Sequence, residues 1–203
     1  MGGAADIQIW DCSPRTGGHS QAIQAMLGDA LRLQGRQPRM VTLRDYQVWP
    51  CQGCQRCSGA RGCVLAHADA CEYLFALLFA ARAVCFVAPI YFYHLPAPFK
   101  ALIDRSQSVY VRGEGEHQDD SDAGQDQGAS AFGLLHAGRA RGERLFAGSI
   151  VTLRFFVRSF SLSLEEVYTI RGMDEVQHKG WPNVLLQSTQ TLAERMVEGS
   201  KNV

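Results

Sequence analysis

The feature that most constrains the fold is the junction at residues 6–20, where an apolar stretch runs through a loop into a helical pattern. Residues 6–12 have the length and apolar content of a short buried strand. Residues 13–20 are small, polar or basic, and helix-forming sequence follows directly. A strand, a glycine-containing loop and a helix in this order predict the opening unit of an α/β domain.

The same junction predicts an anion site. Free backbone N–H groups and the positive end of the helix dipole meet where the loop enters the helix. Ser13, Thr16 and Ser20 can add hydroxyl donors, and Arg15 can add a positive charge. Neither G-x-G-x-x-G nor G-x-x-x-x-G-K-[ST] is present, which excludes the two common nucleotide loops. We interpret the loop as a phosphate cradle; the alternative is a plain strand-to-helix turn with a capping serine.

Composition narrows the class of protein. A length of 203 residues and 46% hydrophobic content suit one domain over residues 1–203. Zero net charge predicts no general attraction to nucleic acid or to an anionic membrane. The first residues lack the basic and apolar pattern of a secretory leader. Seven cysteines, four of them clustered, differ from a secreted disulfide framework, so we expect a reducing cytoplasm.

Strand and helix patterns alternate along the chain. Strands are expected at residues 6–12, 38–43, 83–88, 131–136 and 166–170, and helices at 20–35, 66–82, 99–109, 143–160 and 182–197. Repeated β–α units predict a doubly wound five-stranded parallel sheet, order 2-1-3-4-5, with helices on both faces. The loops that start at residues 13, 89 and 137 each follow a strand and should gather at one edge of that sheet.

Two further loops interrupt this pattern. A cysteine-rich loop spans residues 46–63. Residues 112–130 carry six acidic side chains among Gly, Gln and Ser, a composition typical of a mobile, solvated loop.

Three segments carry a family resemblance. Residues 13–20 (S-P-R-T-G-G-H-S), residues 89–105 (P-I-Y-F-Y-H-L-P-A-P-F-K-A-L-I-D-R) and the cysteines of residues 51–63 are the segments concerned. The first two resemble the phosphate loop and second flavin-binding segment of the NAD(P)H-dependent FMN reductases in the flavodoxin-like superfamily. The third is similar to the cysteine motif of the iron–sulfur flavoproteins, a branch of that family.

The resemblance implies that the chain binds FMN. The residues expected around the phosphate are Ser13, Arg15, Thr16, Gly17, Gly18, His19 and Ser20. Those expected along the isoalloxazine are Pro89, Ile90, Tyr91 and Phe92. A flat, apolar redox ring needs such walls, and plain core packing is the alternative for these aromatic residues.

Other loop residues have two interpretations each. His94 is expected to reach the flavin edge or a substrate, or else to be a polar loop residue or an interface contact. Gly138 and Arg139 are expected to form a third wall of the flavin site, and Arg139 could instead attract the phosphate of a nicotinamide donor or be solvated. Asp104 and Arg105, at a helix end, suggest an ion pair or a subunit contact.

The cysteine motif leaves three interpretations open. Cys51, Cys54, Cys57 and Cys63 can wrap a [4Fe–4S] cluster, because closely spaced thiolates converge on one cubane. Zinc is a second interpretation and free thiols a third. Cys12, Cys71 and Cys85 lie in apolar patterns and are expected to be buried.

These expectations define a leading function and two alternatives. The leading hypothesis is an FMN-dependent oxidoreductase that takes a hydride from NAD(P)H and reduces a small acceptor such as a flavin, quinone or metal ion. One alternative is an electron-transfer protein that uses FMN, with or without [4Fe–4S], between redox partners. The other is a flavin-free module on the same fold. A homodimer or homotetramer is implied by the family resemblance.

Overall fold

The computed structural model describes residues 6–58, 62–112 and 129–201. Five parallel strands form one sheet in the order β2-β1-β3-β4-β5, which confirms the predicted topology. The strands are β1 (Ile7–Asp11), β2 (Arg39–Thr42), β3 (Ala83–Pro89), β4 (Ala129–His136) and β5 (Leu162–Ile170). The acidic loop predicted to be mobile lies mostly outside the described residues, which resume at residue 129.

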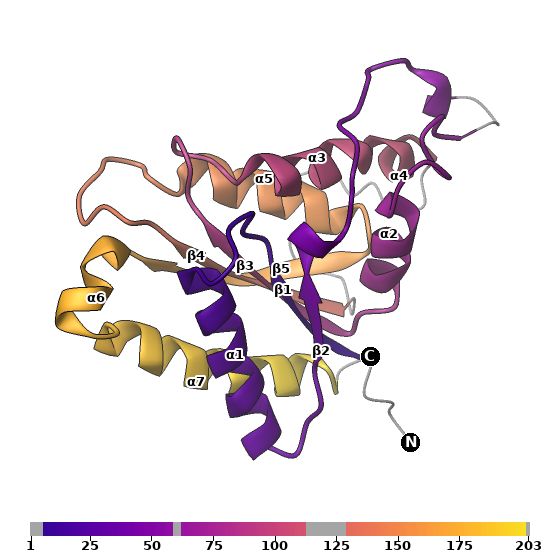
Figure 1. Ribbon diagram of the computed structural model, residues 1–203. Helices are drawn as coiled ribbons and strands as arrows, with labels where there is room; N and C mark the ends of the chain where they lie inside the picture. The colour runs from indigo at the N-terminus through magenta and orange to yellow at the C-terminus, as the bar shows by residue number, and fades with distance from the viewer. Residues whose placement is uncertain (1–5, 59–61, 113–128, 202–203) are drawn as a thin grey trace.

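Helices cover both faces of this sheet (Figure 1). On one face α1 (His19–Leu33) packs beside α7 (Asn183–Gly199). The other face carries α2 (Cys71–Phe79), α3 (Ala97–Arg105), α4 (Gln107–Arg112) and α5 (Ala147–Arg158). The short α6 (Val176–Lys179) and the 3-10 turns η1 (Leu43–Asp45), η2 (Arg56–Ser58) and η3 (Met173–Glu175) lie in connections.

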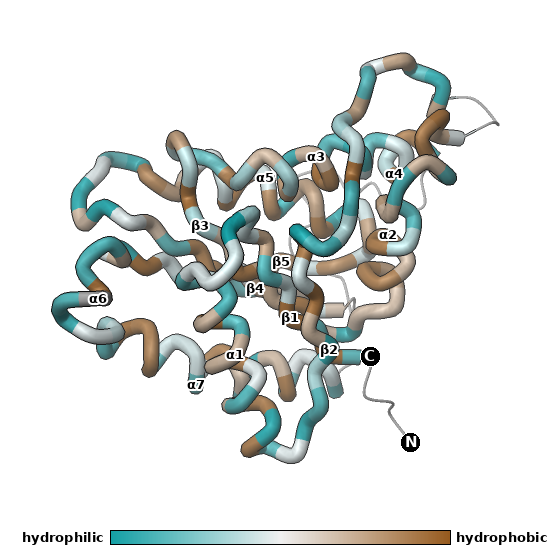
Figure 2. The backbone as a smooth tube through the Cα atoms, in the orientation of Figure 1, coloured by the Kyte–Doolittle hydropathy of each residue, from teal (hydrophilic) through white to brown (hydrophobic). Residues whose placement is uncertain are grey.

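Burial on both faces explains the uniformly apolar β3. Its residues alternate between two cores: Val84 and Phe86 face one, while Cys85 and Val87 face the other. In the first core, Phe86 packs with Phe99 and Phe156. Figure 2 shows the hydrophobic colour concentrated in the strands and in patches along the helices, with mainly hydrophilic colour in the loop after β4.

Two predicted helices are shorter than expected, and a third is divided in two. The segment 66–82 becomes helical only from Cys71, because the Asp69 carboxylate accepts the backbone N–H of Cys71 and that of Trp49. The segment 99–109 divides into α3 and α4 at Ser106, whose hydroxyl donates to the Ile103 carbonyl. The segment 143–160 starts as a helix only at Ala147.

The three cysteines predicted to be buried are buried. Cys12, Cys71 and Cys85 have no exposed surface. Burial raises the pKa of all three thiols, to about 12 for Cys71, so they stay protonated and unreactive at neutral pH.

Candidate functional site

Three loops meet at the carboxyl edge of the sheet, as the topology predicted. The Cys12 N–H donates to the Val87 carbonyl at 2.9 Å, which joins the start of the first loop to β3. The Ile90 N–H donates to the His136 carbonyl at 2.8 Å, which joins the second loop to the end of β4. Ligands of doubly wound sheets bind at this edge, where the strand order reverses.

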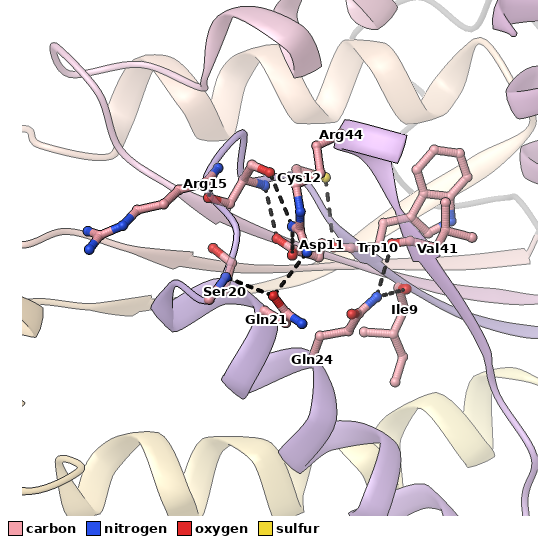
Figure 3. A network of polar contacts seen from close by, with 12 residues as sticks. Ile9, Trp10, Asp11, Cys12, Arg15, Ser20, Gln21, Gln24, Val41 and Arg44 are labelled. Carbon is pink, nitrogen blue, oxygen red and sulfur yellow. Dashed lines mark hydrogen bonds and ion pairs between the residues drawn. The ribbon is translucent and has the colours of Figure 1, made fainter. Parts of the chain in front are cut away.

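A buried carboxylate organises the first loop. Asp11 ends β1 with no exposed surface, and one of its oxygens, Oδ1, accepts the Ser13 N–H at 3.0 Å. Its Oδ2 accepts Arg44 Nη1 at 2.5 Å, and Arg44 follows β2 in η1. The Ser13 hydroxyl oxygen in turn accepts a hydrogen bond from the Arg15 backbone N–H. Figure 3 shows this cluster, with the Arg15 side chain directed away from it.

The network continues into the helix. Arg44 Nη2 donates to Gln21 Oε1 at 3.0 Å, and the same oxygen accepts the Gly17 N–H at 3.0 Å. Gln24, one turn later, donates to the carbonyls of Ile9 and Val41 and so fixes α1 against β1 and β2 (Figure 3). The loop is therefore held in place by side chains that the sequence interpretation did not select.

The N-terminus of α1 is open to an anion. Its N-cap is Gly18, and no side chain caps it. The first N–H groups of such a helix lack partners within the helix and carry the positive end of its dipole. Gly17 has φ +68°, a left-handed conformation that favours glycine. Thr16 is exposed, whereas Ser13 and Ser20 are buried at the base of the loop.

His136, which ends β4, lies beneath this loop. Its Nε2 is 2.7 Å from the Ser20 hydroxyl, and its ring meets the His19 ring edge-on. Burial, assisted by the nearby His19, lowers the pKa of His136 to about 3. The imidazole is therefore neutral near pH 7 and can orient the Ser20 hydroxyl without adding charge.

The second loop is a tight turn at the sheet edge. The Tyr91 and His94 backbones exchange two hydrogen bonds of 2.9 Å, and Phe92 and Tyr93 between them have φ of 48° and 64°. Phe92 is fully exposed, and Tyr91 and Tyr93 are about half exposed, so plain core packing does not account for them. Left-handed conformations in residues other than glycine are strained and concentrate at functional sites.

The remaining predicted residues have mixed surroundings. Pro89 is buried in β3, while Ile90 is partly buried at the edge. His94 points to α5, where its Nε2 is 3.2 Å from the Thr152 hydroxyl. Arg139 Nη1 donates to the Tyr93 hydroxyl at 3.5 Å, which links the third loop to the second.

Gly138 has a packing reason to be glycine. A Cβ at this position would lie 2.3 Å from Asp174 Oδ1, and the Gly138 carbonyl accepts the Asp174 N–H. The turn after β4 is thus packed against η3, while Arg139 remains at its surface.

The four clustered cysteines line a separate cavity of about 200 Å³. The loop that carries them projects beyond the helices at the upper right of Figure 1. Gly53 and Gln55 have left-handed φ, which turns the short loop back on itself. The described residues, which include all four cysteines, contain no group of three arranged to hold a metal ion. All four thiols that a cluster would need are present in this loop, but their sulfur atoms do not converge on one point.

The comparisons with known proteins decide the family. The family described as NADPH-dependent FMN reductase matches residues 6–137, which include β1 through β4. The chain belongs to this family. No helix in the described part of this family member is both long and apolar enough to cross a bilayer.

Relatives of this FMN reductase family member agree in fold. An iron–sulfur flavoprotein from Methanosarcina thermophila is 30% identical over 94 residues, which cover 46% of this chain and 48% of that protein. The match thus spans about half of that relative. A flavone reductase structure has a TM-score of 0.67 at 9% identity and covers 96% of this chain and 62% of its own. A flavodoxin from the domain Archaea has a TM-score of 0.54 at 12% identity and covers 96% and 98%. The two structures show a flavodoxin-like fold.

Proposed function

We propose that this protein is an FMN-dependent oxidoreductase that accepts a hydride from NAD(P)H and reduces a small acceptor, such as a flavin, quinone or metal ion. The observation that carries the proposal is the α1 N-terminus, which no side chain caps and which the Asp11–Arg44–Gln21 network holds at the sheet edge. Family membership supports FMN as the anion.

The loop residues have distinct roles in this proposal. The first-turn N–H groups of α1 and the Ser13 and Ser20 hydroxyls bind the phosphate, with Gly17 and Gly18 allowing close approach. Arg15 and Thr16 are exposed and can close over the phosphate, and His19 flanks it. His136 keeps the Ser20 hydroxyl in position.

The ring is proposed to lie against the second and third loops. Pro89, Ile90, Tyr91 and Phe92 supply its apolar wall, and His94, Gly138 and Arg139 border it. When bound, FMN supplies the hydride and electron chemistry. The protein positions the ring, shields it from water and offers Arg139 as a cation for the phosphates of the nicotinamide donor.

The experiment mixes the FMN-loaded protein anaerobically with NADH and, separately, with NADPH, and follows the visible absorbance of the flavin. Loss of the oxidised flavin spectrum is expected with at least one donor. A spectrum that stays oxidised with both donors would overturn the reductase proposal. The variant Arg32→Gln, in the exposed last turn of α1 and far from the loop at its N-terminus, is the control and should behave as the unaltered protein.

A second proposal concerns electron transfer through the cysteine loop. It rests on the cavity that all four cysteines share, since four thiolates are the donor set of a [4Fe–4S] cluster. The related iron–sulfur flavoprotein supports it. An iron and sulfide count on anaerobically prepared protein tests it: stoichiometric iron supports the relay, stoichiometric zinc indicates a structural site, and neither metal indicates free thiols.

Assembly and compartment remain proposals as well. All seven cysteines are free thiols, which supports a reducing compartment such as the cytoplasm.

Tyr110, Val151 and Phe155 are exposed along a groove between α4 and α5, and Phe92 is exposed at the sheet edge. We propose that these apolar surfaces contact a second copy in a homodimer or homotetramer; light scattering on the purified protein would detect a monomer instead.

A further inference from the structure

Trp181 lies in the connection between α6 and α7, and its backbone is fixed on both sides. Gly180 ends α6 with φ +75°, a left-handed conformation that favours glycine, and its N–H donates to the Val176 carbonyl at 2.8 Å. Pro182 is the N-cap of α7, and a proline restricts the residue before it to extended conformations. The indole is partly buried against the core on the α1 and α7 side of the sheet. A rigid turn therefore determines where Trp181 lies.

The Trp181 indole contacts the first residue of α1, which is His19. The two ring centroids are 5.8 Å apart, and the ring planes meet at 81°. The His19 ring also meets the His136 ring, at 6.1 Å and 79°. Edge-on contacts between rings are favourable and restrict the orientation of both partners. The half-buried His19 is therefore held by the end of β4 and by the connection between α6 and α7.

His19 occupies an unusual place for a basic side chain. It is the first residue of α1, and no described side chain caps this end of the helix. The first turn, residues 19–22, contains no acidic residue. The N-terminus is the positive end of the helix dipole, where anions rather than cations are favourable. The nearby Asp11 carboxylate is already paired with Arg44. A residue that opposes its own helix in this way is typical of a functional site.

We propose that Trp181 is a positioning residue for the phosphate site, and that it orients the His19 imidazole so that a ring N–H donates to the phosphate of FMN. The inference rests on the proposed function and adds a fourth segment, after β5, to the three loops of the site. His136 is neutral near pH 7 and supports the His19 ring without a competing charge. The alternative is plain packing between α1 and α7. A positioning residue acts through His19, whereas a packing residue does not.

The test is a double-mutant cycle on the dissociation constant of FMN, measured with the full chain prepared free of FMN. The variants are Trp181→Ala, His19→Ala and the two combined, and Trp181→Phe keeps an aromatic ring. The matched control is Trp49→Ala, which removes an exposed indole but keeps the backbone hydrogen bonds of Trp49 to Asp69 and Arg105. Urea unfolding shows whether each variant is folded. Trp181→Leu, which retains apolar bulk, takes the place of Trp181→Ala if the alanine variant does not fold.

Trp181→Ala and His19→Ala should each raise the dissociation constant of FMN about tenfold, because a hydrogen bond to a charged group is misaligned or lost. The combined variant should also bind about tenfold more weakly, and not about a hundredfold, because Trp181 acts through His19. Trp181→Phe and Trp49→Ala should bind FMN within about twofold of the unaltered protein. Riboflavin, which has no phosphate, should bind Trp181→Ala and the unaltered protein equally.

Three results would overturn the inference: an FMN dissociation constant unchanged in Trp181→Ala, effects that multiply in the combined variant, or equal weakening of FMN and riboflavin binding. The last two would indicate plain packing. The proposed function fails separately. A bound flavin that neither nicotinamide donor reduces would refute the reductase and leave the roles of Trp181 and His19 standing, whereas failure of the unaltered protein to bind FMN would refute both.

Discussion

At the scale of single residues, the candidate flavin site depends on polar groups buried under the first loop. Asp11 and His136 lie at the ends of β1 and β4, the two strands that flank β3, and each holds a different part of the loop. Neither side chain is exposed enough to contact a ligand freely. Their role is to keep Ser13, Ser20 and Gly17 in a conformation that an anion can use.

His136 predicts a pH dependence of stability for the FMN-free protein. Its pKa is about 3 when folded, against the usual value of 6.5, so the unfolded chain binds the proton first. The contribution of His136 to the free energy of unfolding is therefore fully present above about pH 6.5 and decreases as the pH falls towards 3. The slope from this group approaches about 1.4 kcal/mol per pH unit. Urea unfolding of His136→Asn should lose this slope, whereas His178→Asn, on exposed α6, should keep it; an unchanged slope in His136→Asn contradicts the prediction.

The Asp11–Arg44 pair predicts a large stability loss. Arg44→Ala leaves the fully buried Asp11 carboxylate without its cation, which costs about 3 kcal/mol in a buried pair. Arg32→Ala removes a surface partner of Asp29 and should cost under about 0.5 kcal/mol. Urea unfolding measures both variants. Equal losses in the two would show that the Asp11 pair does not hold the loop.

At the scale of elements, α1 and α7 form the helical layer beside the loop at residues 13–18, and each contains a glycine in contact with a strand residue. A Cβ at Gly199 would lie 2.6 Å from Ser130 Oγ and 2.9 Å from Ser130 Cβ on β4. A Cβ at Gly28 would lie 3.0 Å from the Cε of Met40, the end of a flexible side chain. The two helices therefore tolerate an added methyl group differently.

This difference predicts effects of opposite sign. Gly199→Ala should destabilise the protein by about 1–3 kcal/mol, because α7 must move away from β4. Gly28→Ala should stabilise it by up to about 1 kcal/mol, because Met40 can move and alanine favours the helix interior. Thermal or urea unfolding of both variants checks the prediction. Stabilisation by Gly199→Ala would mean that α7 does not pack against β4 as closely as described.

At the scale of the whole molecule, the proposed cofactor predicts a stability shift that depends on phosphate. FMN at a hundredfold excess over its Kd should add about 2.7 kcal/mol to the free energy of unfolding, because it binds only the folded chain. Riboflavin has the same ring without the phosphate and should add much less at equal concentration. Equal stabilisation by the two ligands would contradict a phosphate site at α1. Thermal unfolding with each ligand measures the difference.

The sequence by itself determined the strand order and the loops at the carboxyl edge, and it predicted the anion site at residues 13–20. These features follow from local patterns: apolar runs, glycine turns and the junction of a strand with a helix. The cysteine spacing likewise predicted a shared loop, and the structure places all four cysteines around one cavity.

Only the tertiary structure decided which polar side chains support those sites. Asp11 meets Arg44 across 33 residues, Asp69 meets Arg105 across 36, and Ser20 meets His136 across 116. Local patterns carry no information on such pairs, because the contact exists only after distant strands and helices have packed. The same packing buries these groups, and burial is what makes His136 neutral near pH 7.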